Sequence, residues 1–135
     1  MAHISEATYS LLAGATGVTN LVGTRIRRLV IDPVEVTPFL QVQLVSLTPT
    51  ELLSSNRRPV HAATCEISSW SHDYDTAREL AEVVRDTLDQ SNNSTHSGVD
   101  ILSILQIDEE EQAVELAADS VLIRIVQTYE IQYRS

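Results

Sequence analysis

The sequence has few of the residues that cross-link a small protein or bind a cofactor. One of its 135 residues is cysteine, Cys65, so an internal disulfide is excluded. Its four glycines form no phosphate-binding loop. No apolar run approaches the ~20 residues that a membrane span requires. These shortages exclude a disulfide scaffold, a P-loop enzyme and a helical membrane protein.

Lysine is absent as well, and all nine basic residues are arginines against nineteen acids, a net charge of −10. This balance disfavours a protein that grips nucleic acid by its phosphates. The charge is also uneven: residues 1–58 carry five arginines and four acids, whereas residues 59–135 carry four arginines and fifteen acids. A chain with two differently charged halves is suited to head-to-tail contacts with copies of itself. The start of the chain lacks the basic and apolar regions of a signal peptide, so we expect a cytoplasmic protein or a particle assembled there.

The remaining composition is that of a globular domain, with 43% hydrophobic residues. We expect one domain, residues 1–135, of the α+β class, in which helices pack on one face of an antiparallel sheet. Apolar spacing predicts the order α-β-β-β-α-β-β. The predicted helices span 4–13 and about 73–89, with a helical turn at 16–23 between the first helix and the first strand. The predicted strands span 25–31, 38–47, 60–70, 98–108 and 121–134.

The helix after residue 72 has the clearest pattern. Asp73 is a suitable N-cap, and Arg78 can pair with Glu82 one turn later. An apolar stripe at steps of three and four should face the sheet; it consists of Tyr74, Ala77, Ala81, Val84 and Leu88. Core positions expected elsewhere are Leu11, Val42, Cys65, Ile67, Ile101, Ile123 and Ile125.

The segment "GVDILSILQID", residues 98–108, is apolar on both faces. It is therefore either a central strand or a strand whose second face is covered by a partner. The acidic stretch "DEEEQAVE" that overlaps its end, residues 108–115, lacks the ligand spacing and central glycine of a calcium loop, and we interpret it as a solvated acidic turn.

No candidate for catalysis stands out. The stretch "HDYD", residues 72–75, invites a metal or acid–base interpretation, but its position at a helix start already accounts for both aspartates. The four histidines are scattered, and the Gly-x-Ser-x-Gly pattern of a nucleophilic serine is missing. We therefore predict no catalytic, cofactor-binding or metal-binding residues, and no enzymatic activity.

As a whole the sequence resembles the tail-completion, or tail terminator, proteins of tailed bacteriophages. The resemblance covers nearly the full chain and rests on the order of five segments. These are "ISEATYSLLAG" running into "GVTNLVGTRI", then "FLQVQLVS" after Pro38, "CEISSWSHDYDTARELAEVVRDTL", "GVDILSI" and the closing "RIVQTYEIQY". The sequence departs from the family in having no glycine between Asp108 and the last strand, so contacts of that hairpin are not carried over.

The resemblance implies a structural virion protein at the head-proximal end of the tail. Such subunits form rings, commonly of six, that end the tail tube and receive the head-tail connector or stopper protein. DNA passes through the lumen without being bound, and no cofactor or membrane is involved. Assembly would take place in the host cytoplasm.

The alternatives are another ring protein of the same particle, such as a head-tail connector or tail-tube subunit, or a small acidic monomeric enzyme or binding module. A polar pocket in a monomer would favour the last.

Two segments are candidates for assembly contacts. The polar loop at 48–59 is either a subunit or partner interface or a mobile hairpin tip; its candidate residues are Leu52, Leu53, Arg57 and Arg58. The acidic run either lines the ring lumen, pairs with the arginine-richer half of a neighbouring subunit, or is a solvated hairpin; its candidate residues are Asp108, Glu109, Glu110, Glu111 and Glu115.

Overall fold

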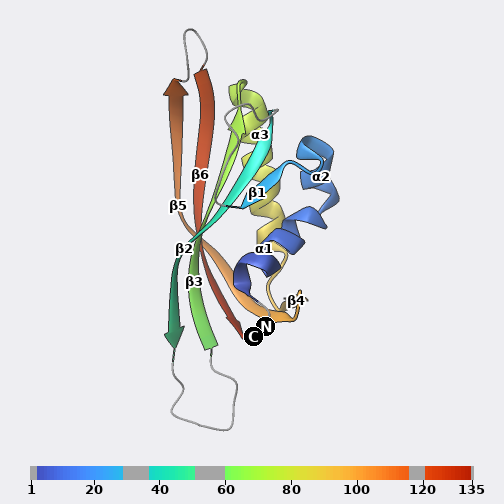
Figure 1. The fold of residues 1–135 in the computed structure, drawn as a ribbon, viewed down its shortest axis with the longest axis vertical. Helices are drawn as coiled ribbons and strands as arrows, with labels where there is room; N and C mark the ends of the chain where they lie inside the picture. The colour runs from blue at the N-terminus through green and yellow to red at the C-terminus, as the bar shows by residue number, and fades with distance from the viewer. Residues whose placement is uncertain (1–2, 29–36, 51–59, 116–120, 135) are drawn as a thin grey trace.

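The computed structural model describes residues 3–28, 37–50, 60–115 and 121–134. Within them three helices cover one face of a six-stranded, mostly antiparallel, strongly twisted and curled sheet (Figure 1). This confirms the predicted α+β class. The elements are α1 (Ile4–Ala13), α2 (Thr16–Val22), β1 (Ile26–Arg28), β2 (Phe39–Thr50), β3 (Val60–Ser71), α3 (Tyr74–Asp89), β4 (Ser94–His96), β5 (Val99–Glu115) and β6 (Val121–Arg134).

The strands are arranged in the order β1-β2-β3-β6-β5-β4. All neighbouring strands are antiparallel except β1 and β2, which are parallel. The parallel pair and the short β4 were not predicted, because local sequence patterns do not determine which strands become partners.

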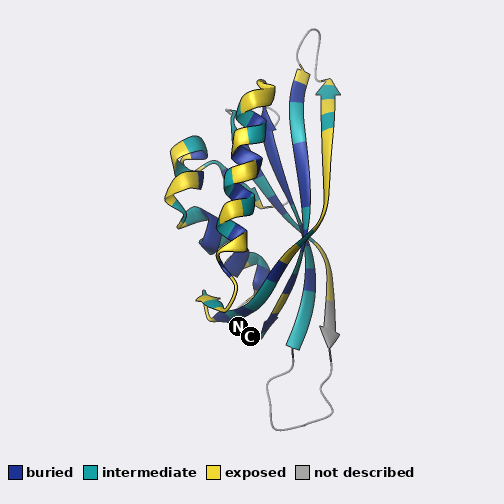
Figure 2. Cartoon of the chain, turned by 180° about the vertical axis from the view of Figure 1, so that it is seen from behind, coloured by how far each residue is buried: buried dark blue, intermediate teal, exposed yellow. Residues whose placement is uncertain are grey.

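The main core lies between the helices and the sheet. Figure 2 shows the buried positions of α1 and α3 turned toward the strands and the exposed positions turned away. The packing of α2 on α3 is close, since a Cβ at Gly17 would lie 3.1 Å from Val83 Cγ1. The predicted core positions are all buried except Ile123, which is partly buried.

Helix α3 forms as predicted. The Asp73 side chain accepts a hydrogen bond from Thr76 N at 3.2 Å, which satisfies one of the free N–H groups at the helix start. On the sheet-facing side of the helix four residues are fully buried: Ala77, Ala81, Val84 and Leu88. Tyr74, by contrast, is 45% exposed. Including Tyr74 in the buried stripe was therefore wrong; its hydroxyl instead donates a hydrogen bond to Glu111 Oε2.

A smaller apolar cluster lies on the outer face of the sheet, which is the face turned away from the helices. Phe39 and Trp70 stack with ring centroids 5.8 Å apart, and Leu122 packs with them. The Arg124 guanidinium lies 5.2 Å from the centroid of the Trp70 ring, and Trp70 Nε1 donates to Gln41 Oε1 at 3.2 Å. The tryptophan is buried, as aromatic residues in small domains usually are, but on the side that carries no described helix.

Strand β5 is not central, which corrects one of the two interpretations of residues 98–108. It lies between β6 and the three-residue β4, and β4 pairs only with Val99–Ile101. Leu105 and Ile107 beyond that point are 62% and 50% exposed. The other interpretation, a strand covered by a partner, stays a prediction.

Candidate assembly surface

The acidic run lies on strand β5 and not in a turn. Residues Asp108 to Glu115 pair with β6 from Thr128 back to Val121, so the two strands continue past the point where the sequence suggested a reversal. The prediction failed because a strand held by a neighbour on one side can carry charge on both faces. All five acidic residues of the run are exposed, although the side chain of Glu109 is only 28% exposed.

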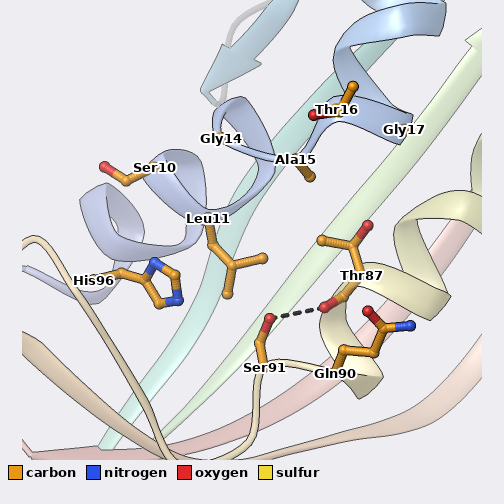
Figure 3. Close-up of a pocket in the computed structure, with 10 residues that line it drawn as sticks. All are labelled: Ser10, Leu11, Gly14, Ala15, Thr16, Gly17, Thr87, Gln90, Ser91 and His96. Carbon is orange, nitrogen blue, oxygen red and sulfur yellow. Dashed lines mark hydrogen bonds between the residues drawn. The ribbon is translucent and has the colours of Figure 1, made fainter.

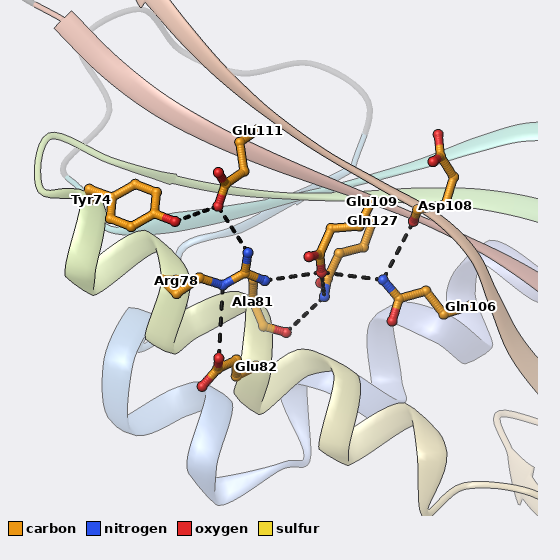
Figure 4. A network of polar contacts seen from close by, with 9 residues as sticks. All are labelled: Tyr74, Arg78, Ala81, Glu82, Gln106, Asp108, Glu109, Glu111 and Gln127. Atoms are coloured by element: carbon orange, nitrogen blue, oxygen red, sulfur yellow. Dashed lines mark hydrogen bonds and ion pairs between the residues drawn. The ribbon is translucent and has the colours of Figure 1, made fainter.

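Two of these acids are held by α3. Arg78 Nη2 lies 3.0 Å from Glu109 Oε1, and Arg78 Nη1 lies 3.0 Å from Glu111 Oε2 (Figure 4). Tyr74 Oη also donates to Glu111 Oε2, at 2.6 Å. The predicted Arg78–Glu82 pair is present but longer, at 3.9 Å. Arg78 therefore ties the helix to the strand and relieves the repulsion between neighbouring carboxylates within one chain.

A buried glutamine completes this network. Gln127 on β6 is fully buried, and its Nε2 donates to Ala81 O at 3.0 Å and to Glu109 Oε1 at 3.1 Å. It thus joins β6, α3 and β5 at one point. The available signal was a polar residue between Ile125 and Tyr129 on the otherwise apolar face of the last strand, and sequence reasoning missed it.

The network shifts the ionisation of its members. Burial raises the pKa of Glu109, but hydrogen bonds from Arg78, Gln127 and Gln106 together outweigh it, so its pKa lies below the ordinary value. Burial likewise lowers the pKa of Arg78, and its carboxylate partners together outweigh this and raise it. The hydrogen bond to Glu111 raises the pKa of Tyr74. Glu109 and Arg78 are therefore more firmly charged than in isolation.

The other acids of the run face elsewhere. Asp108 and Glu110 point to the outer face, opposite Thr128 and Val126, and Glu115 lies at the end of β5 opposite Val121. Within the described residues none of these three carboxylates has an ion-pair partner. The run therefore separates into an internal pair, Glu109 and Glu111, and acids that are available to a partner.

The described part of the chain also has a cavity of about 450 Å³ between the three helices and β4 (Figure 3). Several of its polar groups already have partners: Ser91 Oγ donates to Thr87 O at 2.7 Å, and Ser10 Oγ lies 2.7 Å from Ser97 Oγ. His96 is the one titratable residue among the ten that line it. The cavity therefore offers no pair of groups for acid–base chemistry.

The remaining sequence candidates are not brought together. His72 Nδ1 lies 3.1 Å from Val121 O, and Asp73 caps α3, so these two residues of "HDYD" have local roles. Across the described ranges no group of three or more His, Cys, Asp or Glu residues is placed to hold a metal ion. The loop candidates Leu52, Leu53, Arg57 and Arg58 lie outside the described residues. No helix in the described part of the chain is long and apolar enough to cross a membrane.

Comparison with solved structures shows that the chain shares its α+β fold with a component of a virion. That component is a chain from the virion of a native gene transfer agent particle. It matches with a TM-score of 0.68 and 18% sequence identity, over 96% of this chain and 92% of that one. A second solved chain matches at a TM-score of 0.46 and 12% identity, over 91% of this chain and 89% of its own, which is too distant to support a conclusion. No protein-family model and no curated protein matches the sequence.

Proposed function

We propose that this chain is a structural subunit of a phage-like virion. The observation that carries the proposal is the shared fold with the gene transfer agent virion chain, because the match spans nearly all of both chains. A fold alone does not determine a function, so the proposal also depends on the residues of this chain. Its separation of charge and its exposed acidic strand are the features expected of an assembling subunit.

More narrowly, we propose that the chain is a tail terminator. In this role copies form a ring, hexameric as in the family that the sequence resembles, which ends the tail-tube and binds the head-tail connector or stopper protein. The protein carries out no chemistry, and DNA passes through the lumen without stable binding. A subunit with a net charge of −10 is compatible with this passage, because it repels the polyanion.

The experiment that tests this role uses the purified protein and the tail-tube protein of the same genome. Native mass and negative-stain images are recorded for the protein alone and after mixing with assembled tubes. We expect a ring of defined mass, alone or on tube ends, and tubes that stop growing once capped. A protein that stays monomeric and does not bind tubes contradicts the proposal. A ring that coats or extends the tube identifies another ring protein of the particle instead.

A further inference from the structure

The two edges of the sheet carry complementary residues at the same positions along the strands. Because facing residues form rows that run across the sheet, the height of each edge residue can be read from the strand register. One such row consists of Arg27 on β1, Gln41, Ser68, Val126 and, at the opposite edge, Glu110 on β5. An arginine and a glutamate therefore stand at the same height on opposite edges and on the same face.

A second pair of features lies nearer the other end of the strands. Leu44 on β2 and Gln106 on β5 share one row, through Cys65 and Tyr129. Each edge strand has a β-bulge directly beside this row, between Leu44 and Ser46 on β2 and between Gln106 and Asp108 on β5.

Exposed apolar residues lie at both bulges and close to them. Val45 is 50% and Leu47 45% exposed on β2, and Leu105 is 62% and Ile107 50% exposed on β5. Bulges are common where a strand edge is protected from indiscriminate pairing or is shaped for a contact. Here the bulge residue of each edge, Val45 on β2 and Ile107 on β5, presents an apolar side chain to solvent beside the same row.

Both edges are open at these heights within the described residues. Strand β1 pairs with β2 only from Leu40 to Val42, and β4 pairs with β5 only as far as Ile101. Asn92 Oδ1 accepts a hydrogen bond from Ile104 N at 2.8 Å, so the open part of β5 begins after Ile104. The stretch of β5 beyond it contains Leu105, Ile107 and Glu110.

The direction of the strands permits the two edges to meet. Because β2, β3, β6 and β5 alternate in direction, β5 runs opposite to β2. A second copy placed beside the first in the same orientation would set its β2 antiparallel to β5. This contact is heterologous, and repeated around an axis it closes a ring.

We propose that the β5 edge of one subunit binds the β1–β2 edge of a second copy. In this contact Ile107 packs against Val45 of the neighbour, and Glu110 faces the neighbour's Arg27. The alternative of two β5 edges meeting each other is disfavoured, because it would bring two acidic runs together. The inference rests on the proposed function in assuming that copies assemble into a ring, and it adds which surfaces meet.

Disulfide trapping tests the apolar half of the contact. Val45→Cys and Ile107→Cys variants are made singly and mixed, and the double variant is made as well. We expect heterodimers from the mixture, a ladder of linked subunits from the double variant, and no linking by either single variant alone. The native Cys65 is a suitable silent background, because it is fully buried and burial raises the pKa of its thiol to about 11.

Charge exchange tests the polar half. Glu110→Arg and Arg27→Glu should each reduce self-association at least about tenfold at low salt, and the double variant should recover it, because the pair is restored between subunits. Glu79→Arg, an equal charge change on the exposed side of α3, should leave association unchanged. Arg27 Nη1 also donates to Thr24 O at 3.4 Å, so its substitution could affect folding. Thermal melts therefore check that each variant is folded.

The outcomes separate this inference from the proposed function. Rings or tube caps that form although positions 45 and 107 do not cross-link would overturn the edge contact and leave the virion role standing. Failure of the double charge variant to recover self-association would do the same. Linking by Ile107→Cys alone identifies two β5 edges meeting and overturns it too. A wild-type protein that neither self-associates nor binds tubes overturns both.

Discussion

Arg78 in helix α3 and Glu109 in strand β5 lie 3.0 Å apart and join two elements that are distant in the chain. The contact fixes how the helix sits over the acidic strand, and it leaves the outer-face acids of that strand free for other partners. Substituting Arg78 with alanine should lower the free energy of unfolding by about 1–3 kcal/mol, because the partly buried Glu109 and the more exposed Glu111 each lose a charge-assisted hydrogen bond.

The control for this substitution is Arg85→Ala, which removes an arginine from the same helix. Urea unfolding of both variants gives the comparison. Equal losses of stability in the two variants would show that the network contributes nothing beyond the general effect of losing a cation.

Acid should weaken the same contact. The folded-state pKa of Glu109 lies below its ordinary value of 4.5, so its contribution to stability is fully present above that value and is lost as pH falls through the folded pKa. The difference in melting temperature between the wild type and Glu109→Gln should therefore be larger at about pH 6 than at about pH 3. A difference that stays constant over this range would contradict the assignment of a lowered pKa.

The buried face of α3 supports the core. Ala81 is fully buried, with a relative accessibility of 0%. Ala81→Asp should bury an unpaired charge and cost several kcal/mol, enough to unfold a marginal domain. Glu82→Asp, at the adjacent exposed position, should have little effect. An unchanged melting temperature for Ala81→Asp would contradict the packing of this helix face on the sheet.

The loop candidates call for a functional test, because they lie outside the described residues. Changing Leu52, Leu53, Arg57 and Arg58 together to serine should leave a folded subunit that no longer completes tails, since a sequence with leucines beside arginines is typical of an interface. Folding is checked by circular dichroism and completion by the yield of joined particles. Joined particles at the wild-type yield would show that the segment is not an assembly contact.

Sequence patterns predicted those parts of the fold that depend on local period. Helix α3 could be placed because its apolar residues recur at helical spacing behind the N-cap Asp73. The parallel partner of β1 and the position of β5 near the edge could not, because strand order depends on contacts between distant segments. The acidic run was mistaken for a turn for the same reason: its pairing with β6 and the link from Arg78 to Glu111 are tertiary contacts that residues 108–115 do not reveal by themselves.

The position of the protein in an assembled particle tests the central claim most directly. A tagged copy is incorporated into particles of the same genome, labelled with gold and located by electron microscopy. The proposed function predicts a single cluster of label at the junction between head and tail, and long headless tails when the protein is absent. Label along the tail tube, at its distal tip or nowhere on the particle would contradict it.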